Sequence, residues 1–174
     1  MSDVNANTKG AGTPPAEELS EQQLSELLQI RRDKLKALQN DGKDPFVVTT
    51  WEQTHHAKEI VDDFETLEGQ AVSVAGRIMT WRDMGKASFI DMRDESGRIQ
   101  IYIRINDVGE ETYAAFGGWD IGDIVGIKGT VFRTRRGEIS IHATELKLLS
   151  KSLLPLPDKF HGLKDTDTRY RQRY

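Results

Sequence analysis

The side chains best suited to chemistry in this sequence lie in two neighbouring stretches, 86–93 and 98–105. In the second stretch every other residue is isoleucine, so the isoleucines share one face of an extended strand and Gln100 lies on the other face. By the same alternation Phe89 lies on the polar face of the first stretch. If a short loop joins the two stretches, Phe89 pairs with Tyr102 and has Gln100 as its diagonal neighbour. An aromatic ring, an amide and arginines then meet on one surface.

This combination is typical of a surface that binds single-stranded nucleic acid. A base can stack on Phe89, the amide of Gln100 can pair with the edge of a base, and arginines can hold phosphate or stack. Stacking on an aromatic side chain contributes about 1–3 kcal/mol per base. The pattern alone leaves a second interpretation open, in which Phe89 packs under a loop or the N-terminal helix and the polar side chains form a solvated face.

No other group of residues in the sequence has the spacing of a catalytic or metal site. His55 and His56 are adjacent, so their side chains diverge on a helix, and no further histidine or carboxylate completes a set of metal ligands. His142 alternates with Ile141, which favours a surface or binding-face role. The sequence lacks a glycine-rich phosphate loop, a nucleophile paired with a base, and a closely spaced acid pair. We therefore predict no catalytic residue, metal or cofactor in this chain.

Length and composition limit the class of protein. The 174 residues suffice for one well-buried domain with accessory helices. The absence of cysteine is compatible with a reducing compartment, and no apolar run approaches the roughly 18–20 residues of a membrane span. A net charge of -4 argues against a protein that coats nucleic acid indiscriminately, although it is compatible with a small domain that binds nucleic acid specifically. We expect a cytoplasmic protein without a membrane partner.

The first part of the sequence predicts helices rather than strands. Residues 1–16 have almost no bulky apolar side chains and are expected to form a disordered tail. An N-terminal helical extension is expected over 17–66. Leucines at three-, four- and seven-residue steps predict a helix over 17–40, and a capping-box spacing that starts at Thr50 predicts a second helix over 50–64.

From residue 70 the hydrophobic period changes from that of a helix to that of a strand. Five strand-like segments follow, at 70–82, 86–93, 98–105, 123–134 and 138–148. Residues 106–119 read as a helix between the third and fourth segments. Three strands, a helix and two strands is the order of the OB-fold. We therefore predict a mainly β fold with accessory helices, in which an OB-fold five-stranded barrel over 67–150 is preceded by N-terminal α-helices.

Several motifs along the predicted barrel match one protein family. They are GRIMTWRDMGKASFIDMRD at 76–94, GRIQIY at 97–102, GDIVGIKGTV at 122–131 and TRRGEIS at 134–140. With these motifs the sequence resembles the N-terminal domain of the aspartyl, asparaginyl and lysyl class II tRNA synthetases. The motifs LPLPDKFHGL at 154–163 and RYRQRY at 169–174 narrow the resemblance to the bacterial lysyl enzymes. It covers about residues 18–174.

The resemblance implies that this surface reads the anticodon of tRNA(Lys). Phe89 resembles the aromatic residue that stacks on the central uracil, and Gln100 resembles the amide that pairs with the same base. Arg82 is similar to the arginine at the end of the first strand that contacts this base. Glu138 is similar to the glutamate that reads a neighbouring anticodon base.

Other positions are weaker RNA-binding candidates under the same resemblance. Lys86 and His142 lie near the expected binding face. Arg31 and Arg32 belong to a basic helix that is similar to the N-terminal helix of these enzymes and is placed to touch the tRNA backbone. A structural role for that helix, packed on the barrel, remains equally open.

The resemblance also assigns the catalytic steps to residues outside this sequence. In the family the motif at 169–174 leads into the first class II motif, so 151–174 are expected to form the hinge and the start of a catalytic domain. The full-length parent is expected to be a homodimeric lysine–tRNA ligase that uses ATP and Mg²⁺, whereas this fragment alone is expected to be non-catalytic. The oligomeric state of the fragment stays open.

Two other functions compete with this interpretation. A stand-alone OB-fold module would bind single strands or protein partners without being part of a ligase. Such a module is not expected to carry the motifs at 154–163 and 169–174. A synthetase paralogue that modifies a translation factor is disfavoured, because those proteins resemble the catalytic domain and lack this anticodon domain.

Overall fold

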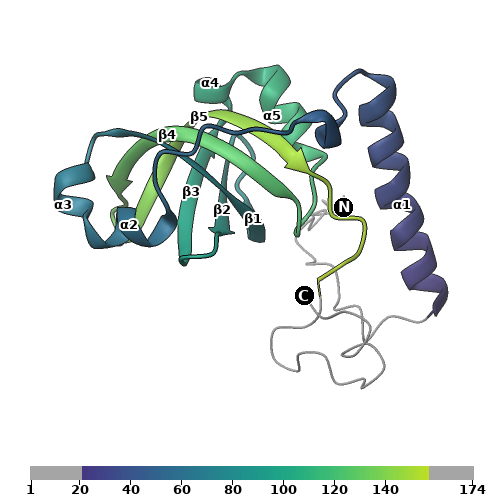
Figure 1. The fold of residues 1–174 in the computed structure, drawn as a ribbon, viewed down its shortest axis with the longest axis horizontal. Coiled ribbons are helices and arrows are strands. Elements are labelled where there is room, and N and C mark those ends of the chain that lie inside the picture. Colours follow the sequence, from purple (N-terminus) through teal and green to yellow (C-terminus); the bar gives the residue numbers. More distant parts are fainter. Residues whose placement is uncertain (1–20, 157–174) are drawn as a thin grey trace, which may run out of the picture.

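A computed structural model of the chain describes residues 21–156, so the tail predicted over 1–16 and most of the hinge predicted over 151–174 lie outside the described residues. Helices precede the strands, as predicted. They are α1 (Glu21–Asn40), the short 3-10 helix η1 (Pro45–Val47), α2 (Ala57–Asp62) and α3 (Phe64–Leu67). Figure 1 shows α1 standing beside one end of the barrel, while α2 and α3 lie at the other end.

The strands close into the five-stranded barrel that the sequence predicts. They are β1 (Ala71–Asp83), β2 (Ala87–Arg93), β3 (Arg98–Arg104), β4 (Ile124–Arg133) and β5 (Ile139–Ser150). Their order around the barrel is β1-β2-β3-β5-β4, in which β3 and β5 are parallel and the other neighbours are antiparallel. The helices α4 (Ile105–Val108) and α5 (Glu110–Gly117) lie between β3 and β4. The OB-fold topology is therefore confirmed.

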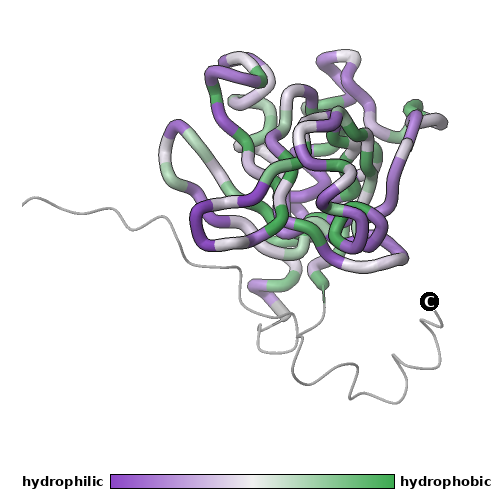
Figure 2. The backbone as a smooth tube through the Cα atoms, turned by 90° about the vertical axis from the view of Figure 1, so that its left-hand side faces the viewer, coloured by the Kyte–Doolittle hydropathy of each residue, from purple (hydrophilic) through white to green (hydrophobic). Residues whose placement is uncertain are grey.

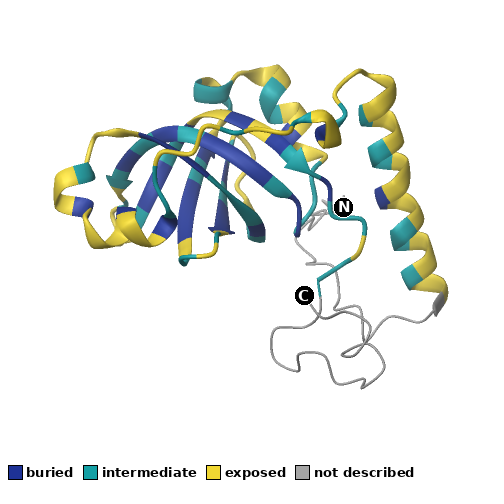
Figure 3. Ribbon diagram, viewed as in Figure 1, coloured by how far each residue is buried: buried dark blue, intermediate teal, exposed yellow. Residues whose placement is uncertain are grey.

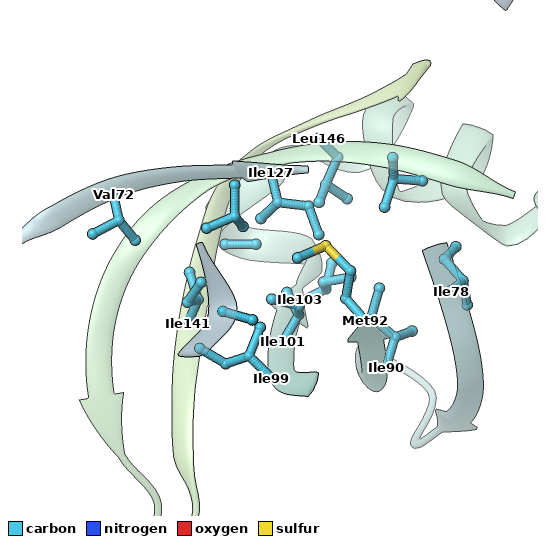
Figure 4. Close-up of a cluster of buried hydrophobic side chains, with 14 of the residues drawn as sticks. Val72, Ile78, Ile90, Met92, Ile99, Ile101, Ile103, Ile127, Ile141 and Leu146 are labelled. Carbon is cyan, nitrogen blue, oxygen red and sulfur yellow. The ribbon is translucent and has the colours of Figure 1, made fainter. Parts of the chain in front are cut away.

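Alternation along the strands fills the barrel with branched aliphatic side chains. Ile99, Ile101 and Ile103 of β3 are almost completely buried, and they pack with isoleucines and valines from the other strands and with Met92 (Figure 4). Burial of one such side chain contributes roughly 1.5–3 kcal/mol. Figure 3 shows the buried residues concentrated on the strands, and Figure 2 shows hydrophilic residues gathered on the outer turns. This core fixes which side chains of β2 and β3 face outward.

The expected pairing of β2 with β3 is confirmed residue by residue. Phe89 lies opposite Tyr102, and Asp91 lies opposite Gln100. A shift by one residue would bring the isoleucines to the surface, so the core holds this register. The register in turn places the predicted nucleic-acid-binding side chains on one outer surface.

The second predicted helix begins seven residues later than expected. Residues 50–56 are not helical, and the helix starts at Ala57, where the Glu59 carboxylate accepts a hydrogen bond of 2.7 Å from the His56 backbone N–H. The spacing from Thr50 that predicted a capping box was therefore misleading. The physical reason is Trp51, whose indole N–H donates to the Val74 carbonyl at 3.1 Å and so ties this segment to β1.

The helix predicted over 106–119 is interrupted. Gly109, with φ 89° and ψ 154°, separates α4 from α5, because this backbone conformation is incompatible with a continuous helix. Phe116 of α5 is buried and stacks on Trp81 of β1, with ring centroids 4.0 Å apart. The two short helices thus cap the barrel, with this aromatic contact and with a hydrogen bond of 3.0 Å between the hydroxyl groups of Tyr113 and Ser88.

Arg31 ties α1 to the segment that leaves the barrel. Its side chain is buried, and its guanidinium donates to the carbonyl groups of Ser152, Leu154 and Ile121 at 3.0, 3.2 and 3.2 Å. A buried guanidinium needs such partners, because an unpaired buried charge is costly. Of the two roles left open for this helix, these contacts favour the structural one for Arg31, which fastens the N-terminal helix to residues 152–154.

A cluster of charges continues from Arg31 toward β5. The Lys151 ammonium is fully buried and donates to the carboxylates of Asp123 at 2.8 Å and Asp120 at 2.5 Å. Asp120 also accepts a hydrogen bond of 2.6 Å from Lys34 of α1. We call Lys34, Asp120, Asp123 and Lys151 the ionic cluster. It joins α1, the loop before β4 and the end of β5.

The ionic cluster predicts how stability changes in acid. Burial raises the pKa of Asp120, but hydrogen bonds from Lys151 and Lys34 and their charges outweigh this effect, so its pKa is lowered. A lowered folded-state pKa gives stability that is present above the unfolded pKa of about 3.9 and is lost as the pH falls below it. Asp120→Asn should therefore cost about 1.5–3 kcal/mol at pH 7, and less at pH 3.

Urea unfolding at pH 7 and pH 3 measures this difference. Asp62→Asn is the matched control, because the Asp62 carboxylate is exposed and pairs only with Lys58 among the described residues. We expect the control to lose less than about 0.5 kcal/mol at either pH. A cost for Asp120→Asn that stays the same at both pH values would contradict the assignment.

Candidate nucleic-acid interface

Four aromatic rings from four strands lie side by side on the outside of the barrel. Phe89 of β2 contacts Tyr102 of β3 at 4.8 Å between ring centroids, and Tyr102 contacts His142 of β5 at 5.3 Å. Phe132 of β4 completes the set, 5.9 Å from His142. All four residues are partly exposed. We call them the aromatic row; such a row offers ring faces on which bases stack irrespective of their identity.

Arg82 covers one end of the aromatic row. It lies opposite Phe89 in the pairing of β1 with β2, and its guanidinium carbon is 5.6 Å from the centroid of the Phe89 ring. The Arg82 side chain is exposed, so it can swing aside or close over a base that enters. Lys86, also exposed, lies in the turn between β1 and β2. A phosphate or base beside Phe89 would meet positive charge here.

Gln100 lies next to the aromatic row and is held in one orientation. It is 8% exposed, and its amide oxygen accepts a hydrogen bond of 2.9 Å from the Ser140 hydroxyl across the parallel pair of β3 and β5. Within the described residues, its amide nitrogen has no hydrogen-bond partner. The amide oxygen is thus engaged by Ser140, whereas the amide N–H groups are left as hydrogen-bond donors. Sequence reasoning did not find Ser140, because this pairing joins residues 40 positions apart.

Acidic side chains border the same surface. Glu138 lies just before β5 with a half-exposed carboxylate, 3.6 Å from the guanidinium of Arg98. Arg98 is also 3.6 Å from Asp91, whose carboxylate accepts a hydrogen bond of 2.6 Å from the Thr80 hydroxyl. An exposed carboxylate can accept a hydrogen bond from the N–H group of a base. Glu138 is thus chemically suited to read a base edge.

His142 is fixed from the side of α4. Its Nε2 is 2.7 Å from Asp107, and Asp107 also accepts hydrogen bonds of 2.7 and 3.1 Å from Arg104. The hydrogen bond from Arg104, followed by the one from His142, lowers the pKa of Asp107 to about 2. Asp107 therefore carries a full negative charge at neutral pH. The contact of Asp107 with His142 and Arg104 was not predicted from the sequence.

The structure brings most of the predicted site residues together. The strand register places Arg82, Phe89 and His142 in one line with Tyr102 across β1, β2, β3 and β5. Gln100 lies one diagonal step from Phe89, and Glu138 lies just before β5. Arg32 is exposed on α1.

The adjacent histidines and a surface hollow lie outside the aromatic row. His55 and His56 contact Thr54 and Gln53, at 2.8 and 3.1 Å, and across residues 21–156 no three histidine or acidic side chains gather as a metal site would require. A hollow of about 520 Å³ opens beside β1 and β2, lined in part by His56 and Arg93, and includes none of the site residues. Of the helices described, none is sufficiently long and apolar to cross a membrane.

Comparison with known proteins agrees with this geometry. Residues 72–149 match the tRNA-anticodon family, described as the OB-fold nucleic acid binding domain. Lysine–tRNA ligases are similar over 154 residues, or 88% of this chain, with 58% identity for Clostridium tetani strain Massachusetts and 56% for Clostridium botulinum strain Langeland. The chain spans 31% of the length of both relatives. Residues 72–149 of the barrel are therefore similar to the OB-fold nucleic acid binding domain, and the chain is similar to lysine–tRNA ligases over about a third of their length.

Proposed function

We propose that the chain binds the anticodon stem-loop of tRNA(Lys) through the aromatic row and Gln100. One observation carries the proposal: an accessible aromatic ring, Phe89, lies beside an amide whose oxygen is already held by Ser140. This pair offers a stacking surface and a fixed hydrogen-bond donor for a single unpaired base. The resemblance of the sequence motifs to the lysyl class II tRNA synthetases supports a uracil as that base.

The proposed roles follow from the position of each side chain. Phe89 stacks on the central uracil, and the amide of Gln100 donates to one of its carbonyl oxygens. Arg82 closes over the base or holds an adjacent phosphate, and Lys86 adds charge beside it. Glu138 accepts a hydrogen bond from the neighbouring anticodon base. Phosphate contacts then supply salt-dependent affinity, and the base contacts supply selectivity.

The aminoacylation reaction belongs, in this proposal, to the remainder of a full-length lysine–tRNA ligase. We propose that the parent uses ATP and Mg²⁺, acts as a homodimer in the cytoplasm, and relies on this domain to select its tRNA. The chain itself contributes binding and no reacting group. Arg32, exposed on α1, remains a proposed contact to the tRNA backbone.

An NMR titration with an RNA hairpin that carries a UUU loop tests the proposed surface. We expect the backbone amide signals of Phe89, Gln100 and Tyr102 to shift strongly. The indole N–H signal of Trp51 is the internal control, because it is bonded to Val74 on the β1–β4 side of the barrel and should not move. Shifts confined to the surroundings of Trp51, or no shifts at all, would contradict the proposal.

A further inference from the structure

His142 occupies a position in the aromatic row where a second base would lie. Its ring contacts Tyr102 on one side and Phe132 on the other, and about a third of its side chain, 34%, is exposed. A ring that served only for stacking would need no hydrogen bond, yet the ring of His142 is anchored by Asp107. The hydrogen bond to Asp107 determines whether the other ring nitrogen of His142 donates or accepts a hydrogen bond.

The contact with Asp107 determines which nitrogen of His142 carries the proton. An ionised carboxylate can only accept hydrogen bonds, so the 2.7 Å contact requires a proton on Nε2 of His142. In the neutral imidazole the other nitrogen, Nδ1, then has a free lone pair and acts as an acceptor. Nδ1 has no hydrogen-bond partner among residues 21–156.

Arg104 restrains the carboxylate of Asp107 that contacts His142. Its guanidinium contacts both carboxylate oxygens of Asp107, at 2.7 and 3.1 Å, so the carboxylate cannot rotate freely. Arg104 lies at the end of β3, where its backbone also leads into α4. Arg104, Asp107 and His142 thus form a chain of hydrogen bonds that ends in one oriented acceptor.

We propose that His142 reads an N–H group on the Watson–Crick edge of a base that flanks the one stacked on Phe89, on the side not read by Glu138, and that Asp107 is the positioning residue that sets its tautomer. This inference rests on the proposed function. An acceptor at this place favours the N3–H of uracil and disfavours cytosine, whose N3 is itself an acceptor. His142 therefore adds specificity, whereas a phenylalanine here would add stacking alone.

A double-mutant cycle on protein and RNA tests the contact. Three UUU hairpins each carry one N3-methyluridine, which lacks the N–H group, at a different anticodon position. At one position, methylation should weaken binding to the wild type by about 2- to 12-fold, and should have no effect in His142→Phe, which keeps a ring in the row. Equal effects of methylation in both proteins at all three positions would overturn the inference.

Phe89→Ala, measured with the unmodified hairpin, separates this inference from the proposed function. If Phe89→Ala weakens binding while the cycle shows no coupling, only the role of His142 fails. If Phe89→Ala has no effect either, the proposed function fails with it. His142→Ala repeats the cycle without the ring, so a packing defect of one variant does not decide the outcome.

The positioning role of Asp107 has its own readout. Long-range ¹H–¹⁵N NMR spectra should show the Nε2–H tautomer of His142 in the wild type and a mixture of tautomers in Asp107→Asn, because an asparagine amide can donate as well as accept. The same variant should lose the methylation effect. Glu110→Gln removes an equivalent charge from exposed Glu110 on α5 and should change neither result. An unchanged tautomer in Asp107→Asn would overturn the positioning role.

Discussion

Lys151→Ala should lower the free energy of unfolding by about 3–5 kcal/mol, the typical cost of removing one partner from a buried ion pair. The Lys151 ammonium and the Asp123 carboxylate are both completely buried, so the variant leaves the charge of Asp123 without its cation. Asp123 also accepts hydrogen bonds from the backbone N–H groups of Ser152 and Asp120. The loss therefore weakens the whole junction between α1, the loop before β4 and the end of β5.

Chemical denaturation followed by tryptophan fluorescence measures this loss. Lys147→Ala is the matched control, since Lys147 is an exposed lysine of β5, the strand that Lys151 directly follows. We expect it to change the free energy of unfolding by less than about 0.5 kcal/mol. If the two lysine variants unfold at the same urea concentration, the ionic cluster does not stabilise the junction.

Phe89→Ala should weaken binding of a UUU hairpin by about 5- to 160-fold, which corresponds to the roughly 1–3 kcal/mol of one base stacked on an aromatic ring. Phe89 supplies the first ring of the aromatic row and the surface over which Arg82 lies. Its removal leaves a base without a stacking partner, while the barrel core, which lies on the other face of β2, is untouched. Fluorescence anisotropy with a labelled hairpin measures the change.

The matched control for this prediction is Phe46→Ala. Phe46 is a 48% exposed phenylalanine in η1, outside the aromatic row. Its replacement removes the same side chain and should leave affinity for the hairpin within about 2-fold, because surface changes away from a site have small effects. Equal losses for the two variants would show that Phe89 does not act as a specific stacking residue.

The barrel and its binding face follow closely from the sequence because both depend on local alternation. Isoleucine at every second position of β3 identifies the core face, and the two-residue period of a strand then places Phe89 and Gln100 outside. The pairing of Phe89 with Tyr102 follows from the short turn alone. The family resemblance suggests the roles of these residues. The alternation of side chains along a strand shows which face they lie on but not what they do.

The features that the sequence did not predict depend on contacts between distant parts of the chain. Nothing in the basic pattern of α1 distinguishes buried Arg31 from exposed Arg32, because the contacts of Arg31 come from residues 121–154. Trp51 overrides a capping-box spacing through its packing on β1 and β4. The contact of His142 with Asp107 arises only when β5 closes the barrel beside β3.

One measurement tests the central claim most directly: the ratio of affinities for two hairpins that differ only in the central base of the loop, UUU and UCU. The wild type should bind UUU more tightly by about tenfold, in the range of about 1–3 kcal/mol for one base-edge contact. Gln100→Met, which keeps the length of the side chain and lacks the amide, should bring the ratio close to one. Equal affinity of the wild type for both loops would contradict anticodon reading and would leave a barrel that binds single strands without selecting their sequence.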